Sequence, residues 1–226
     1  MNENYTQWVN LNPNQEYDEN SYYTIDIQED GTLKGKYSFI KKKYAALSLR
    51  NQIQQQRSLD DYILSVEKKY PGLDISSYSF SALDSVDLPV SGEFEVEIKN
   101  SADVFGNQIV FAPLLFEAMK KNIFKIEDRK YPVEYEYPIS TTCRFLYTIP
   151  DGYTVEAIPT SASFSLPDNS ATFNYKVTVD GNKISVIYKL KINKITFMPT
   201  EYSFLKKFYE TIVAKHNENI VLKKNN

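Results

Sequence analysis

The chain has 226 residues, of which 42% are hydrophobic and 24% are charged, and its formal net charge is -3. These values are ordinary for a globular protein and exclude a disordered chain. Acidic and basic residues are interspersed without a basic stripe, so nucleic acid is not an expected partner. Tyrosine is frequent, at 18 residues, which favours half-exposed sheets because the ring packs while the hydroxyl reaches water.

Targeting and membrane signals are absent from the sequence itself. Residues 1–5 have neither the basic start nor the apolar run of a signal peptide. No stretch of about 15 consecutive apolar residues occurs, so the chain is expected to be soluble and not membrane-spanning. The single cysteine, Cys143, cannot form an internal disulfide, and this leaves the compartment open.

The first half of the chain mixes strand and helix patterns. Apolar residues alternate on both sides of Asp30-Gly31, a pair that supplies the positive φ angles of a tight turn, so a β-hairpin is predicted. A helical period follows over residues 44–56. A second helix is predicted to begin at Ser58, whose hydroxyl can cap it, and to end at Pro71-Gly72. Strands are then predicted at residues 73–80, 94–98 and 108–112, followed by a short helix from Pro113.

From Tyr131 onward the pattern is almost purely that of β-strands. The strongest prediction is a hairpin in which residues 173–179 and 184–192 alternate on the two sides of Asp180-Gly181. An amphipathic helix after Pro199 and a short strand at residues 219–222 complete the fold. Other strand patterns in this half are at residues 131–137, 145–149 and 164–166.

These patterns predict an α+β fold class, namely a mainly antiparallel β-sandwich with a few packed amphipathic helices. The change of character near residue 130 is the candidate boundary. It divides the chain into residues 1–130, of mixed α/β character, and residues 131–226, a C-terminal β-sandwich-like domain with a terminal helix.

The sequence contains only one cysteine and one histidine, so few residues could support cysteine or histidine catalysis. A thiol nucleophile needs a depressed pKa and an oriented base. Cys143 lies inside a strand pattern, whereas the only histidine, His216, ends the last helix, where a cation suits the helix dipole. Two such residues cannot build the usual zinc site. We therefore expect no catalytic residue, no metal ligand and no bound cofactor.

Acidic residues are interpreted as solvated turns and strand faces. The pairs Glu29-Asp30, Asp84 with Asp87, and Glu127-Asp128 do not follow the calcium-loop spacing of an EF-hand. The alternating residues 93, 95 and 97 are typical of an exposed strand face, so a glycosidase pair is not predicted. The isolated glycines form no phosphate-binding loop.

Tyrosines leave one binding alternative open. On a sandwich face they could stack on sugar rings, although ordinary cross-strand aromatic pairing is the favoured explanation. The residues concerned are Tyr22, Tyr131, Tyr135 and Tyr137.

Several short segments resemble, in shared order, the tail of large bacterial transglutaminase-like proteins. In that family a papain-like core is flanked by β-rich domains of unknown function. The resemblance implies an upstream Cys-His-Asp triad and signal peptide in a longer exported parent. None of the triad carries over, because Arg144 follows Cys143 where the family has tryptophan. The segments are 130–133 (KYPV), 149–156 (IPDGYTVE), 165–168 (SLPD), 190–194 (LKINK) and 220–224 (IVLKK), with 8–13 (WVNLNP) and 44–51 (YAALSLRN) upstream.

The expected function is therefore that of a non-catalytic accessory module. Its partner would be the upstream transglutaminase-like core of the same polypeptide, whose substrate access it would shape, and its location would be periplasmic or otherwise exported. The alternative is a β-sandwich module that acts independently and binds a glycan or peptide of the envelope. A third hypothesis, a self-contained enzyme, requires two carboxylates that face each other across a cleft.

Overall fold

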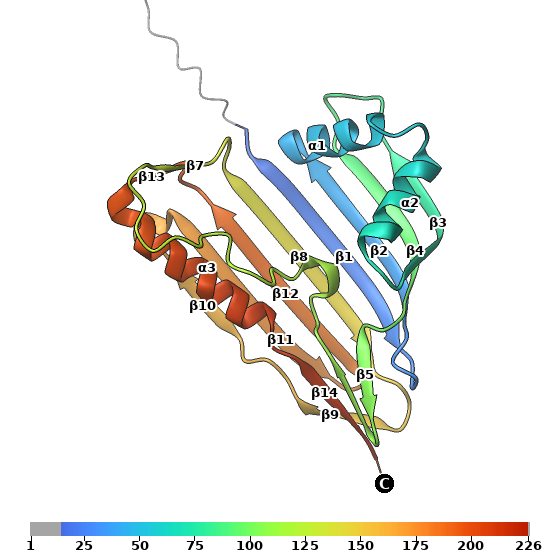
Figure 1. The fold of residues 1–226 in the computed structure, drawn as a ribbon. Coiled ribbons are helices and arrows are strands. Elements are labelled where there is room, and N and C mark those ends of the chain that lie inside the picture. Colours follow the sequence, from blue (N-terminus) through green and yellow to red (C-terminus); the bar gives the residue numbers. More distant parts are fainter. Residues whose placement is uncertain (1–14, 226) are drawn as a thin grey trace, which may run out of the picture.

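The computed structural model describes residues 15–225, and its main body is an eight-stranded sheet in the order β10-β11-β12-β8-β1-β2-β4-β3 (Figure 1). All neighbours are antiparallel except β1 and β8, which run parallel. The strands are β1 (Tyr17–Ile27), β2 (Leu33–Lys42), β3 (Leu73–Ser81), β4 (Val90–Ile98), β8 (Ile139–Thr148), β10 (Ala162–Ser165), β11 (Ala171–Asp180) and β12 (Lys183–Ile192).

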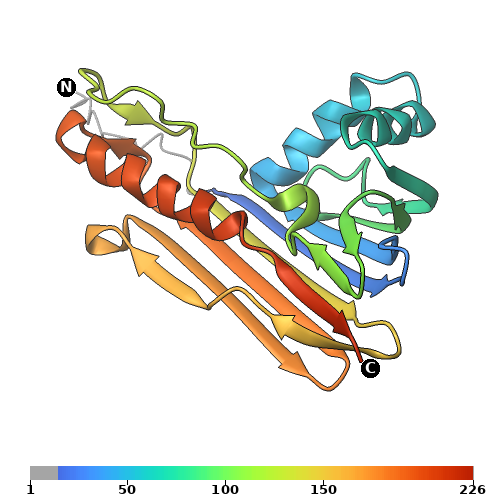
Figure 2. The ribbon, with the colours of Figure 1, turned by 60° about the horizontal axis from the view of Figure 1, so that its bottom comes forward.

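A second layer covers one face of this sheet. It contains a four-stranded sheet in the order β5-β6-β14-β9, a two-stranded pair and three helices, all on the same side of the large sheet (Figure 2). These strands are β5 (Ala102–Phe105), β6 (Gln108–Phe111), β14 (Ile220–Lys224), β9 (Tyr153–Ala157), β7 (Val133–Glu134) and β13 (Thr196–Phe197). The helices are α1 (Lys43–Gln54), α2 (Leu59–Lys69) and α3 (Tyr202–His216).

The hairpins follow from local turn chemistry, as the sequence predicts. Gly31 has φ +82, and the Asp30 carboxylate accepts a hydrogen bond of 2.9 Å from the Thr32 N–H. Along β1 the residues alternate, so that Tyr23 and Ile25 are buried while Thr24 is exposed. The predicted hairpin at Asp180-Gly181 is also confirmed, with β11 and β12 paired along their whole length.

One continuous hydrophobic core joins the two layers. Tyr147 of β8 is fully buried, and its hydroxyl donates a hydrogen bond of 2.7 Å to the carbonyl oxygen of Pro113 beside the small sheet. Its ring packs edge-on against Phe111 of β6 at 5.1 Å. The α+β, sandwich-like and mainly antiparallel fold class is therefore confirmed.

Several predicted elements differ from the structure. The alternating segment 131–137 forms only the two-residue strand β7, because Pro132 and Pro138 cannot donate to a ladder. The helix predicted after Pro113 is a single 3₁₀ turn, η1 (Leu115–Glu117). Strands β5 and β9 have no counterpart among the predictions, and the segment 8–13 lies outside the described residues.

The expected boundary at residue 130 falls in the connector between β6 and β7. The large sheet contains strands from both sides of it, because β1 pairs with β8. The proposed division at residue 130 thus describes a change in sequence character, and the large sheet continues across it.

Within residues 15–225, none of the helices has the length and apolar character needed to cross a bilayer.

Candidate functional site

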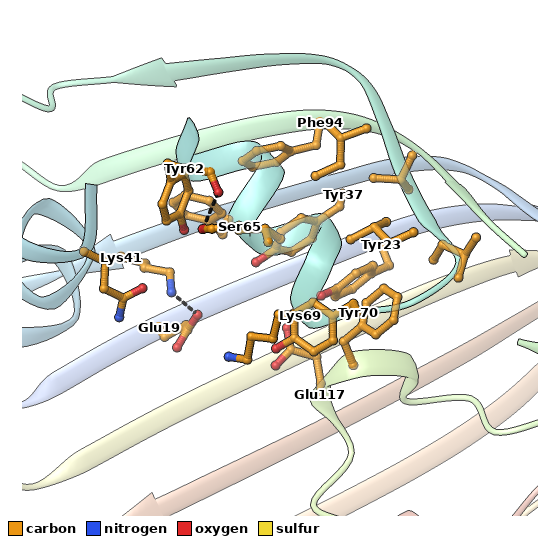
Figure 3. Close-up of a pocket in the computed structure, with 18 of the residues that line it drawn as sticks. Glu19, Tyr23, Tyr37, Lys41, Tyr62, Ser65, Lys69, Tyr70, Phe94 and Glu117 are labelled. Carbon is orange, nitrogen blue, oxygen red and sulfur yellow. Dashed lines mark hydrogen bonds and ion pairs between the residues drawn. The ribbon is translucent and has the colours of Figure 1, made fainter. Parts of the chain in front are cut away.

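A cavity of about 410 Å³ lies between the large sheet and helix α2 (Figure 3). Residues of β1, β2 and β4 form its floor, and residues of α2 lie across it. The end of α1 and the η1 turn supply further walls. This volume lies within the usual range of small-molecule sites, about 300 to 1,000 Å³.

The floor is built by the β1–β2 hairpin. The register pairs Tyr23 with Tyr37 and Glu19 with Lys41, so all four side chains stand on the covered face. The rings of Tyr23 and Tyr37 stack with centroids 4.5 Å apart. Glu19 and Lys41 form an ion pair of 2.6 Å with side chains only 14% and 17% exposed. The Tyr17 hydroxyl donates to the other Glu19 oxygen at 2.9 Å.

Glu117 enters the cavity from the η1 turn. The turn begins with Leu115 in a left-handed conformation, at φ +48, and closes with a hydrogen bond of 2.9 Å from the Glu117 N–H to the Leu114 carbonyl. The Tyr23 hydroxyl donates to Glu117 Oε1 at 2.7 Å. Burial raises the pKa of Glu117, and the nearby Glu19 carboxylate raises it further.

Helix α2 presents one face to the cavity. As predicted, it is capped by Ser58, whose hydroxyl accepts a hydrogen bond of 3.1 Å from the Asp61 N–H. The lining residues Tyr62, Val66 and Lys69 follow the i, i+4, i+7 spacing of one helix face. The Lys69 ammonium lies 5.1 Å from the Tyr70 ring centroid. The cavity therefore combines aromatic, apolar and charged groups.

Two carboxylates, Glu19 and Glu117, line the same cavity, which meets part of the requirement of the enzyme hypothesis. Both oxygens of Glu19 are engaged, one by Lys41 and one by Tyr17. The raised pKa of Glu117 is a shift that general acid–base catalysis can use, but the second carboxylate is not free, because Lys41 and Tyr17 hold it. The arrangement suits binding better than proton transfer.

Cys143 and His216 are both buried in the core and make no hydrogen bond to each other among the described contacts. Cys143 lies in register between Ser21 and Tyr188, and burial raises the pKa of its thiol. A nucleophilic thiol needs the opposite shift. His216 Nδ1 accepts a hydrogen bond of 3.0 Å from the Met119 N–H, so the ring proton lies on Nε2.

The burial of His216 is expected to make the free energy of unfolding depend on pH. Burial lowers its pKa from 6.5 to about 4. The unfolded chain therefore takes up a proton between these values while the native state does not, and stability falls as the pH is lowered through this range. We expect a slope of up to about 1.4 kcal/mol per pH unit.

Urea unfolding of the parent chain and of His216→Gln, at pH about 7.5 and about 5, measures this term. The introduced glutamine does not titrate, and its amide oxygen can still accept from the Met119 N–H. The contribution of Glu117 cancels because both chains contain it. An equal loss of stability on acidification in the two chains would contradict the prediction.

The acidic residues considered in the sequence are dispersed. Glu95 and Glu97 form ion pairs with Lys36 and Lys34 on the uncovered sheet face, at 2.9 and 3.0 Å. Asp84 lies in the exposed loop between β3 and β4. Within residues 15–225, no group of three or more His, Cys, Asp or Glu side chains is arranged to hold a metal ion.

The four tyrosines considered for glycan stacking do not share a surface. Tyr22 is on the uncovered face with the Arg144 guanidinium 5.1 Å from its ring, and Tyr131 is in a loop and 78% exposed. Tyr135 shares a hydrogen bond of 3.1 Å with the Tyr209 hydroxyl. Tyr137 stacks on Tyr17 and Tyr44.

The sequence did not predict that the cavity residues form a site. It indicated Tyr23 and Tyr37 only as members of two alternating strand patterns. The register of the Asp30-Gly31 hairpin was the available signal, since it places both side chains on one face. Glu117 had no such signal, because its partner Tyr23 is far away in the sequence.

Comparison with known proteins gives a family but no activity. A "putative protease" from Parabacteroides distasonis ATCC 8503 is 18% identical, with a TM-score of 0.42, over 52% of this chain and 23% of that one. The aligned part of this chain thus corresponds to less than a quarter of that protein's length. No curated protein matches. Residues 107–222, just over half of the chain, match the family described as Domain of Unknown Function with solved-structure structure (DUF3858). The chain belongs to the DUF3858 family.

Proposed function

We propose that this chain is a non-catalytic accessory module of a larger, exported transglutaminase-like envelope protein. The observation that carries the non-catalytic role is the burial of Cys143 and His216, whose pKa values are shifted away from those that thiol catalysis needs. The ordered sequence segments that resemble the tail of transglutaminase-like proteins support the accessory role, and it is compatible with a family of unknown function. In this proposal the upstream core of the same polypeptide performs the chemistry.

The uncovered face of the large sheet offers the surface for that core. Tyr22, Ile40 and Leu146 come from three adjacent strands and are 37%, 39% and 39% exposed on this face. Half-exposed apolar side chains surrounded by ion pairs are typical of a non-obligate interface. In this proposal the upstream core packs against this face, and the module shapes the access of substrate to the core.

Assays of the purified chain test the non-catalytic role. We expect no amide hydrolysis or glutamine-dependent amide transfer above that of the Cys143→Ala variant. A thiol reagent should modify Cys143 only after denaturation, because the side chain has no exposed surface. Activity that Cys143→Ala abolishes would overturn the proposal.

Genomic sequencing upstream of the Met1 codon tests the accessory role separately. We expect an open reading frame that continues into a Cys-His-Asp core and a signal peptide. A stop codon and a ribosome-binding site immediately upstream would contradict the proposed parent and favour an independent binding module.

A further inference from the structure

The charged groups that line the cavity are unequally paired. Glu19 and Lys41 neutralise each other at 2.6 Å and are linked in Figure 3. Glu117 and Lys69 also line the cavity, but neither has an ion-pair partner among residues 15–225. One carboxyl group and one ammonium group are therefore available to a ligand.

Glu117 and Lys69 enter the cavity from different elements. Glu117 projects from η1, and Lys69 projects from the last turn of α2 (Figure 3). Tyr23 occupies Glu117 Oε1, whereas Oε2 makes no hydrogen bond within residues 15–225, although the buried Ser21 hydroxyl lies near this carboxyl group. An ammonium group is the natural partner for such a carboxylate oxygen, and a carboxylate is the natural partner for the Lys69 ammonium.

Part of the uncharged lining offers an apolar wall to a short aliphatic body, and Gln52, Gln55, Gln56 and Ser65 add polar groups to the rest. Val66, Leu73, Ile75 and Phe116 supply apolar walls. Tyr23 and Tyr37 stack on each other with an interplanar angle of 19°, so their facing ring surfaces are already covered. Sugar recognition by stacking would need an open ring face.

We propose that this cavity binds a small zwitterion of the free amino acid or dipeptide class. The ligand ammonium group pairs with Glu117 Oε2, its carboxylate pairs with Lys69 Nζ, and its aliphatic part contacts Val66, Leu73 and Phe116. The cavity volume of about 410 Å³ accommodates a ligand of this size. The inference goes beyond the accessory role and does not depend on it, because this chain alone forms the cavity.

A nuclear magnetic resonance titration with three dipeptide probes tests the charge pairing. The probes are glycyl-leucine with free ends, its N-acetyl form and its C-terminal amide. We expect the free dipeptide to shift backbone resonances of α2 and η1. It should bind at least about tenfold more tightly than either blocked form, since each blocked form loses one charge-assisted hydrogen bond.

Two variants test which side chain binds each charged end of the dipeptide. Glu117→Gln should bind the free and N-acetyl dipeptides equally, and Lys69→Gln should bind the acid and amide forms equally. The amide oxygen introduced by Glu117→Gln can still accept the Tyr23 hydrogen bond, and dispersed resonances will verify that both variants fold. The matched controls Glu134→Gln and Lys68→Gln change exposed residues outside the cavity and should keep the full discrimination.

Three results of the dipeptide titration would overturn the proposal. They are the absence of shifts at millimolar dipeptide, equal binding of all three probes to the parent chain, and shifts confined to residues outside the cavity. Binding of a neutral disaccharide in place of the dipeptide would also overturn it and assign the cavity to a glycan. None of these results bears on the activity assays, so the two proposals fail independently.

Discussion

Replacement of Arg50 by Met is expected to lower the free energy of unfolding by about 3 to 5 kcal/mol, because it removes a buried charge on which a whole loop depends. Arg50 is only 7% exposed and has no carboxylate partner among the described residues. Its guanidinium donates instead to five backbone carbonyl oxygens between β3 and β4. These belong to Ala82, Leu83, Ser85, Val86 and Leu88, at 2.9, 3.0, 2.5, 3.4 and 2.8 Å.

Urea unfolding and hydrogen exchange measure this effect. The amides of residues 83–88 should exchange faster in Arg50→Met, because their carbonyl groups lose the shared donor. Arg57→Met is the matched control, since Arg57 is exposed on the turn before α2. A loss of stability no larger in Arg50→Met than in this control would refute the role given to Arg50.

Replacement of Gly35 by Ala is expected to destabilise the protein by about 3 kcal/mol, through steric overlap and backbone strain in the central hairpin. Gly35 pairs with Ile25 and has φ +154. A Cβ atom there would lie 2.0 Å from the Thr24 carbonyl oxygen. No rotamer change can relieve a clash with backbone, so β1 and β2 must separate.

A comparison of the thermal unfolding of Gly35→Ala with that of Gly181→Ala isolates the steric part of this prediction. Gly181 also has a positive φ, +55, but its Cβ would meet nothing within 4 Å. This control should lose only the conformational term, about 1 to 2 kcal/mol. Equal losses in the two variants would show that the β1–β2 pairing tolerates the added methyl group.

The parts of the fold that the sequence predicts are those with local causes. Asp30-Gly31 and Asp180-Gly181 determine their turns, and Ser58 begins α2, because each acts on backbone within three residues. The parallel pairing of β1 with β8 has no local cause. Tyr17 pairs with Ile139 because both strands bury one face in a common core, and their periodicity does not specify a partner.

The candidate site shows the same division. The β1–β2 register brings Glu19 opposite Lys41 and could be derived from the hairpin. The position of Glu117 could not, because it depends on a left-handed Leu115 and on a distant contact with Tyr23. Residues with positive φ that are not glycine are uncommon, so no pattern would place the turn there.

The position of β14 has a consequence for synthesis of the chain. This C-terminal strand inserts between β6 and β9, and it pairs with both. Until Ile220–Lys224 leave the ribosome, each of those strands has an open edge, and the small sheet cannot assemble. Folding of the small sheet is thus completed only once Ile220–Lys224 have been synthesised and released, and a chain truncated before β14 is left with two unpaired strand edges.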